Sequence, residues 1–249
     1  MNNSMTKYSP EEILQILTDF YNCQSQFDLE VYPDKKLTFD TTIREWRDIC
    51  DLVEPEELVK YYYKLFKLES QIEELEKLFI WEGKNKLGDL CYYIAKHAQK
   101  EEIIPIISMG RTCQEASIFK TLISKLRQHG INTDDIKPSS DFIPLFEKHG
   151  EVFLIEVNKL APGSLTHFDF KDNWIVTTGW RIIGIFILSI IITPLIWHFH
   201  WSLLIILGVG LTTVMIGKKF KPEKEIIGGY NTIRDLIKGM QGQINKAAT

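Results

Sequence analysis

The sequence is poor in cysteine, and its few cysteines form no close pair. The 249 residues include four, and none stands in a C-x-x-C arrangement: Cys23, Cys50, Cys91 and Cys113. Each lies among apolar neighbours, which is typical of a buried thiol. Because structural disulfides are rare in reducing compartments, the pattern indicates free, buried cysteines in a protein of a reducing compartment.

The first residues lack the features of a cleavable secretory signal. The stretch MNNSMTKYSPEEIL has neither a cationic start nor a continuous apolar core. A signal peptide needs both. Together with the unpaired cysteines, this absence predicts that the N-terminal region lies in the cytoplasm.

Motifs for metal ions and nucleotide cofactors are also lacking. The histidines of the first 170 residues show no H-E-x-x-H or other ligand spacing: His97, His129, His149 and His167. The GVG of 208–210 follows no strand and lies inside an apolar run, and the GKKFK of 217–221 lacks the glycine spacing of a phosphate loop. We therefore expect no metal and no cofactor.

Charge is absent from one long stretch, residues 182–217. These 36 residues contain no Lys, Arg, Asp or Glu. A bilayer core about 30 Å thick needs about 20 helical residues, so the stretch is too long for one span and slightly short for two. Two spans fit if the apolar flanks are included, with Pro194 at the join because proline interrupts a continuing helix. The sequence predicts a two-helix transmembrane hairpin over 174–217, with its turn near 194–200.

Aromatic and cationic residues flank the predicted spans. Tryptophan is enriched at membrane interfaces, and cytoplasmic flanks carry Lys and Arg. The candidate membrane-interface residues are Trp174, Trp180, Arg181, Trp197, Trp201, Lys218 and Lys219. Because cations follow the second span while the turn carries none, both ends of the hairpin are predicted to face the cytoplasm. The expected localisation is an integral membrane protein with both termini cytoplasmic.

Arg181 leaves the depth of the first span open. If that span begins at Asn173, Arg181 lies about 12 Å along the helix, where a charge is costly unless the side chain reaches back to the headgroups. A shorter first span would suit a re-entrant or monotopic hairpin that never crosses the bilayer. A buried hairpin in a soluble protein is the remaining alternative.

The stretch IWHFHW, residues 196–201, raises the question of a metal or pH-sensing site. Its histidines, His198 and His200, are two positions apart and do not face each other on a helix. No third ligand is visible within either apolar run. We interpret the stretch as the place where the chain reverses.

The two ends of the sequence differ in charge. Residues 1–170 carry 20 Lys/Arg and 29 Asp/Glu, a net charge of −9, whereas residues 171–249 carry 9 and 4, a net charge of +5. A negatively charged domain is poorly suited to bind a phosphate backbone, which argues against a nucleic-acid partner. Residues 171–249, with their net positive charge, are suited to bind an anionic surface. The expected partners are a lipid bilayer and a protein.

The first 159 residues show helical periodicity and no convincing strand pair. Ser9 and Glu12 predict a capping box at a helix start, and Thr42 with Glu45 predicts another. The fold class is therefore all-α. The expected organisation is a multi-helix cytoplasmic domain over 1–159, a linker over 160–173, the hairpin, and a basic cytoplasmic tail over 218–249.

Two segments are ambiguous in the sequence. EVFLIEVNKL, residues 151–160, alternates partly like a strand, but it is assigned to a helix because nothing nearby would pair with a lone strand. From Tyr230 onward the tail shows apolar residues at helical spacing. This short amphipathic helix could lie on an anionic lipid leaflet or pack back on the acidic domain.

One stretch, SMGRTCQEAS (108–117), resembles an active loop. A helix N-terminus and Arg111 would both lower the pKa of the Cys113 thiol, as a nucleophile requires. The bases that the fold would have to bring close are His97 and His129. The alternative is a structural one, in which Thr112 is an N-cap completed by Glu115 over a buried cysteine.

The leading functional interpretation is non-enzymatic. It is a membrane-anchored helical interaction or regulatory module that recruits a partner protein to the cytoplasmic face of a membrane. An alternative is an oligomerising, membrane-perturbing or channel-like protein gated by its helical domain, because Ser189 and Thr193 form a small-xxx-small pattern. A second alternative is an enzyme that uses Cys113.

Overall fold

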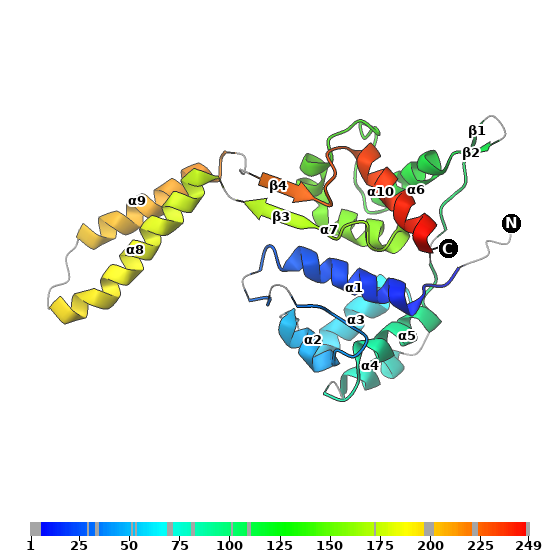
Figure 1. The fold of residues 1–249 in the computed structure, drawn as a ribbon, viewed down its shortest axis with the longest axis horizontal. Helices are drawn as coiled ribbons and strands as arrows, with labels where there is room; N and C mark the ends of the chain where they lie inside the picture. Colours follow the sequence, from blue (N-terminus) through cyan, green and yellow to red (C-terminus); the bar gives the residue numbers. More distant parts are fainter. Residues whose placement is uncertain are drawn as a thin grey trace. The chain divides into compact units, whose positions relative to one another are not determined.

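The computed structural model divides the chain into two compact units (Figure 1). Unit 1 comprises Met1–Phe168 and Ile227–Thr249, and unit 2 comprises Asp169–Ile226. The structure describes residues 6–28, 30–32, 35–50, 52, 54–68, 72–80, 83–100, 102–108, 111–171, 173–196, 202–220 and 224–247. The C-terminal tail therefore belongs to the same unit as the N-terminal helices.

Unit 1 is mostly helical. Its helices are α1 (Pro10–Gln24), α2 (Ile43–Ile49), α3 (Pro55–Leu65), α4 (Ile72–Ile80), α5 (Leu87–His97), α6 (Gln114–Gln128), α7 (Phe142–Leu160) and α10 (Ile233–Ala247). A two-residue antiparallel ladder joins β1 (Ile107–Ser108) to β2 (Arg111–Thr112). This high helical content confirms the all-α prediction.

Helix starts follow the capping chemistry of the sequence. The Ser9 hydroxyl accepts a hydrogen bond from the Glu12 N–H, and the Glu12 carboxylate accepts one from the Ser9 N–H. At the start of α2 the Thr42 hydroxyl accepts a hydrogen bond from the Glu45 N–H. Each cap satisfies backbone donors that have no partner inside the helix, so both predicted helix starts are confirmed.

Helices α1 to α5 enclose the larger apolar core. The apolar stripe of each helix is buried in it, including Trp46 of α2, Tyr62 of α3 and Leu75 of α4. The rings of Trp46 and Tyr62 lie 5.8 Å apart between centroids. Each Å² of buried apolar surface contributes about 25 cal/mol to stability. Short helices such as these are marginal on their own, so the packing of their apolar stripes stabilises them more than their helix propensity does.

Helices α6, α7 and α10 pack together around the phenylalanines of α7. Phe142 and Phe153 are fully buried, with ring centroids 5.6 Å apart. Residues 151–160 are helical, as predicted, and α7 is kinked at His149, whose φ of −138° and ψ of 28° are not helical. The tail helix α10 packs on α6 and α7 and buries Met240. Of the two alternatives for the tail, the structure shows packing on the helical unit.

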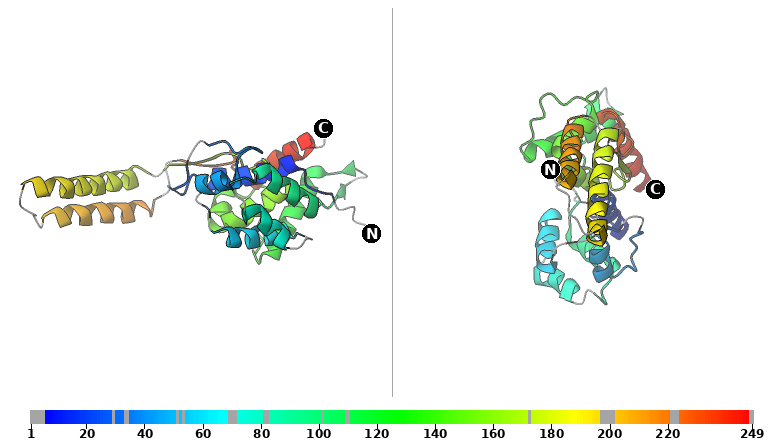
Figure 2. Two further views of the ribbon diagram at one scale, coloured as in Figure 1. Left: turned by 90° about the horizontal axis from the view of Figure 1, so that it is seen from below. Right: turned by 90° about the vertical axis from the view of Figure 1, so that its left-hand side faces the viewer.

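Unit 2 is a helical hairpin that is flanked in the sequence by two paired strands. Strands β3 (Phe168–Lys171) and β4 (Lys224–Ile227) pair with each other, and α8 (Trp174–Ile196) and α9 (Ser202–Gly217) run side by side (Figure 2). Helix α8 continues through Pro194, so the proline lies in its last turn and does not end it. Residues 197–200 of the predicted turn lie outside the described residues.

Glycines bring α8 and α9 into close contact. A Cβ added to Gly179 would lie 2.6 Å from Val214 Cγ2 and 2.8 Å from the Val214 nitrogen, and a Cβ on Gly217 would lie 2.7 Å from Val176 Cγ2. Contacts this close require the absence of a side chain. These glycines therefore pack the two helices of the hairpin against each other.

The predicted transmembrane hairpin is corrected by the structure. Across the part of the chain that the structure describes, no helix is both long enough and apolar enough to cross a membrane. Helix α9 has 16 residues, about 24 Å at 1.5 Å per residue against a bilayer core of about 30 Å. In α8, Arg181 precedes the uncharged run, and the side chains after Ile190 lie outside the described residues. This finding overturns the localisation as an integral membrane protein.

Candidate functional site

Cys113 differs from the other three cysteines in its exposure. Its thiol is exposed, whereas the others are buried. Burial raises the pKa of each buried thiol to about 12, which keeps these thiols protonated and unreactive. The expectation of buried thiols thus holds for Cys23, Cys50 and Cys91 and is wrong for Cys113.

The loop around Cys113 is built by backbone pairing. Cys113 is itself the N-cap of α6, and Thr112 lies in β2 opposite Ile107, so the predicted Thr112 cap is wrong. The Cys113 carbonyl accepts hydrogen bonds from the N–H and the hydroxyl of Ser117. This geometry explains the helix start without any catalytic role for the thiol.

The two histidines considered as bases interact with other side chains. The ring of His97 lies against Tyr93, with 4.7 Å between centroids. The Nε2 atom of His129 lies 2.9 Å from the Glu156 carboxylate. Among the residues that the structure describes, no group of three His, Cys, Asp or Glu side chains could hold a metal ion. A nucleophilic role for Cys113 stays a prediction.

The interface residues predicted at the base of the hairpin are exposed. Trp174 is 73% exposed, and Trp180, Arg181, Lys218 and Lys219 are exposed too. Trp197 and Trp201 lie outside the described residues, as do His198 and His200. Trp174, Lys218 and Lys219 therefore lie at the end of the hairpin where α8 begins and α9 ends, and Trp180 and Arg181 lie about two turns into α8.

Asn173 closes that end of the hairpin. Its side-chain amide donates to the carbonyls of Gly217 and Phe220, at 2.9 and 3.2 Å, and its Oδ1 accepts from the Val176 N–H. Asn173 is buried, so these bonds replace water that it would otherwise bind. The residue both caps α8 and holds the end of α9, a role that the sequence did not reveal.

The exposed side chains of the hairpin that the structure describes are mostly apolar. Among the described apolar side chains of the two helices, those of Val176, Ile183, Phe186 and Val214 are buried. Large apolar side chains remain exposed on both helices: Ile185, Ile187, Leu188, Ile190, Leu204, Ile205, Val209, Leu211, Met215 and Ile216. A helix that is apolar all round is normally surrounded by an apolar environment, and exposed patches of this kind mark interaction sites.

The hydroxyl groups of the hairpin need no water. Each described one donates to the backbone carbonyl four residues earlier, at 2.7 to 3.2 Å: Thr177, Thr178, Ser189, Thr212 and Thr213. Back-bonding of this kind satisfies a hydroxyl where solvent is absent. The polar groups of the hairpin thus fit the same apolar surroundings as its hydrocarbon side chains.

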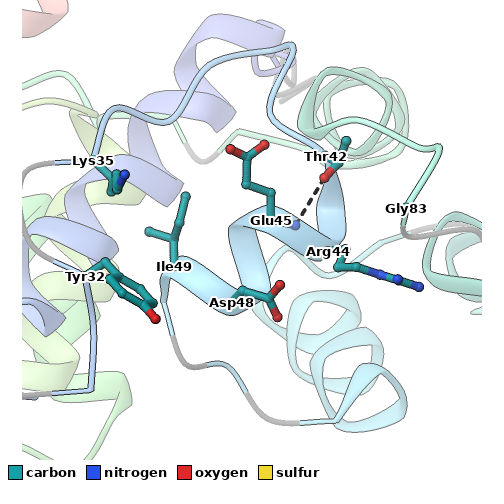
Figure 3. A pocket seen from close by; sticks show the side chains of 8 residues that line it. All are labelled: Tyr32, Lys35, Thr42, Arg44, Glu45, Asp48, Ile49 and Gly83. Carbon is teal, nitrogen blue, oxygen red and sulfur yellow. Dashed lines mark hydrogen bonds between the residues drawn. The ribbon is translucent and has the colours of Figure 1, made fainter.

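Two of the surface depressions that the described residues of unit 1 form differ in character. The first lies along α2 and is lined by Tyr32, Lys35, Thr42, Arg44, Glu45, Asp48, Ile49 and Gly83 (Figure 3). Cationic and anionic side chains alternate there, and one lining group, the Thr42 hydroxyl, is used by the helix cap. The mixed charge gives this depression no preference for one sign of ligand.

The second depression is a groove between α3 and α4. Its buried floor contains Val59 and Phe79, and its lining is completed by Glu54, Pro55, Glu56, Lys60, Glu76 and Ile80. Carboxylates outnumber the ammonium group on its rim. The packing of α3 on α4 brings Glu76 near Glu54 and Glu56, which lie far from it in the sequence.

A buried carboxyl group, missed in the sequence, lies at the junction of α1 with the segment after α7. Asp19 is fully buried and accepts hydrogen bonds at 2.8 Å from the Gln15 side chain and the Gly163 N–H. Burial raises its pKa to about 7, although both bonds act in the opposite direction. Gly163, at φ +83°, is also bonded through its carbonyl to Gln243 of α10. Asp19 thus connects three segments of unit 1.

Comparison with known proteins identifies no family for this chain. No family model matches this chain, and neither a curated protein nor a solved structure is significantly similar to it. The function must therefore be inferred from the chain's own geometry.

Proposed function

We propose that this protein is a non-enzymatic helical interaction module that holds a partner protein at a lipid surface. In this arrangement the hairpin of unit 2 contacts lipid, and the helical surface of unit 1 contacts the partner. Contact with lipid, and not a crossing of the bilayer, is what we propose. The observation that carries it is the hairpin, whose described residues expose many large apolar side chains on both helices and whose described hydroxyl groups are bonded internally.

The distribution of the apolar side chains favours lipid over a second copy of the chain. Each Å² of apolar surface left in water costs about 25 cal/mol, so the exposed side chains of α8 and α9 need a cover. A second hairpin could cover one face only, whereas exposed leucine, isoleucine and valine side chains surround both helices. A lipid surface can take up apolar side chains from either helix.

The charged residues of the hairpin also favour contact with lipid over contact with a second copy of the chain. Between Trp174 and Lys219 the only charged residues are cationic: Arg181, Lys218 and Lys219. All three are exposed. Cations next to an apolar surface attract anionic headgroups, at about 1 kcal/mol per residue near the surface, but would repel their counterparts in a parallel second copy. Trp174 and Trp180 supply the amphipathic rings that favour the headgroup region.

Flotation with lipid vesicles tests the proposed function. The purified full chain, mixed with vesicles that contain anionic lipid, should rise with them in a density gradient. Replacing exposed hairpin residues with charged ones, in the double variant Leu188→Glu and Ile205→Glu, should reduce the floating fraction about tenfold, because each buried charge costs about 2 kcal/mol or more near hydrocarbon.

A matched control separates lipid contact from a general effect of charge. The double variant Tyr92→Glu and Ile104→Glu adds the same charge at equally exposed apolar positions of unit 1 and should float like the native chain. If the native chain stays at the bottom of the gradient, or if both double variants float equally, the proposed lipid contact is wrong.

A further inference from the structure

The groove between α3 and α4 is an apolar cleft with an acidic rim. Helices α3 and α4 pack against each other (Figure 1), and the floor between them is formed by Val59 and Phe79, which are 1% and 4% exposed. At its edge Ile80, the last residue of α4, is 68% exposed. An exposed isoleucine beside an apolar floor offers a hydrophobic contact to an incoming side chain.

The charged side chains of the rim are mainly carboxylates. Glu54, Glu56 and Glu76 line the groove together with a single ammonium group, that of Lys60. The Glu54 side chain is 86% exposed and lies 3.9 Å from Arg47, which leaves it accessible to a ligand. Three carboxylates and one ammonium group give the rim a net negative charge, which repels phosphate headgroups and nucleic acid and attracts cationic ligands.

We propose that this groove binds an amphipathic, cationic helix of the partner protein. Such a helix would place an apolar side chain against Ile80, whose exposed surface lies beside the buried floor of Val59 and Phe79. Its Lys or Arg side chains would lie beside the carboxylates of Glu56 and Glu76. The recruiting role of this contact rests on the proposed function, whereas the contact itself depends only on unit 1.

The probe for the test is a fluorescent 11-residue peptide, as long as α3, with Leu on one helical face and Lys elsewhere. Its anisotropy is measured as the full chain is titrated in a nonionic detergent, so the result does not depend on lipid. The double variant Glu56→Gln and Glu76→Gln should weaken binding roughly tenfold, at about 0.5–1 kcal/mol for each exposed ion pair. Ile80→Ser should also weaken it, because it removes apolar contact without disturbing the core.

The control variant carries the same change of charge elsewhere on α4. Glu73 and Glu74 are exposed and do not line the groove, so Glu73→Gln with Glu74→Gln should leave peptide binding within about twofold of the native chain, since surface charges away from a contact contribute little. Equal weakening by both double variants would show unspecific attraction and overturn the groove assignment. Equal binding of a peptide with Glu in place of Lys would also overturn it. Failure here with successful flotation would leave the proposed lipid contact intact.

Discussion

At the scale of single residues, the most unusual group is the Asp19 carboxyl. Its burial raises its pKa from 3.8 to about 7, so the folded protein binds a proton on Asp19 more tightly than the unfolded chain does. The free energy of unfolding should therefore fall as the pH rises from about 4 to about 7, by at most about 4 kcal/mol from this group. Below the unfolded-state pKa this penalty is absent.

Replacement of Asp19 by Asn tests this charge penalty. Asn keeps an oxygen that can accept the Gly163 N–H but carries no charge. At pH 8 we expect the Asp19→Asn variant to be more stable than the native chain by a few kcal/mol, with the difference vanishing near pH 4, since the penalty is about 1.4 kcal/mol per pKa unit. Urea unfolding of both proteins across this pH range measures it. A variant that is less stable at pH 8 would show that the bonds to the carboxylate outweigh its burial.

At the scale of elements, the close approach of α8 and α9 depends on glycine. A Cβ at Gly179 would meet Val214, including its backbone nitrogen, whereas nothing lies within 4 Å of a Cβ at Gly208. We expect Gly179→Ala to destabilise the hairpin by about 1–3 kcal/mol through overpacking. Gly208→Ala should be neutral or stabilise it by up to about 1 kcal/mol.

Hydrogen exchange of the hairpin amides, followed by mass spectrometry, compares the two glycine variants. Faster exchange across α8 and α9 in Gly179→Ala alone is the expected result. Equal exchange in both variants would mean that the helices are not held together by this contact.

The sequence predicted elements well where their cause is local. The caps at Ser9 and Thr42 depend on residues three positions apart, and the structure confirms both. The groove carboxylates and Asp19 could not be found in this way, because their environment is created by helices distant in sequence. The same holds for Cys113, whose position as N-cap depends on the pairing of β2 with β1. The prediction of a transmembrane hairpin was wrong because the length of an uncharged run in the sequence does not give the length of the helices that it forms.

At the scale of the whole molecule, the chain combines two units with opposite surface chemistry. Unit 1 buries its apolar stripes in shared cores, and its α3–α4 groove carries carboxylates. Among its described residues, unit 2 buries Val176, Ile183, Phe186 and Val214 and exposes large apolar side chains on both of its helices. This division fits a protein that contacts lipid through one unit and a protein partner through the other.

The most direct measurement is the quenching of a fluorophore by lipid chains. In a Cys113→Ser background, which removes the exposed native thiol, a fluorophore is attached to a cysteine that replaces Leu188, or to one that replaces Tyr92, a residue of matched exposure in unit 1. Vesicles with brominated acyl chains should strongly quench the fluorophore at position 188 and leave that at position 92 unchanged. Equal emission from both positions in brominated and ordinary vesicles would contradict lipid contact by the hairpin.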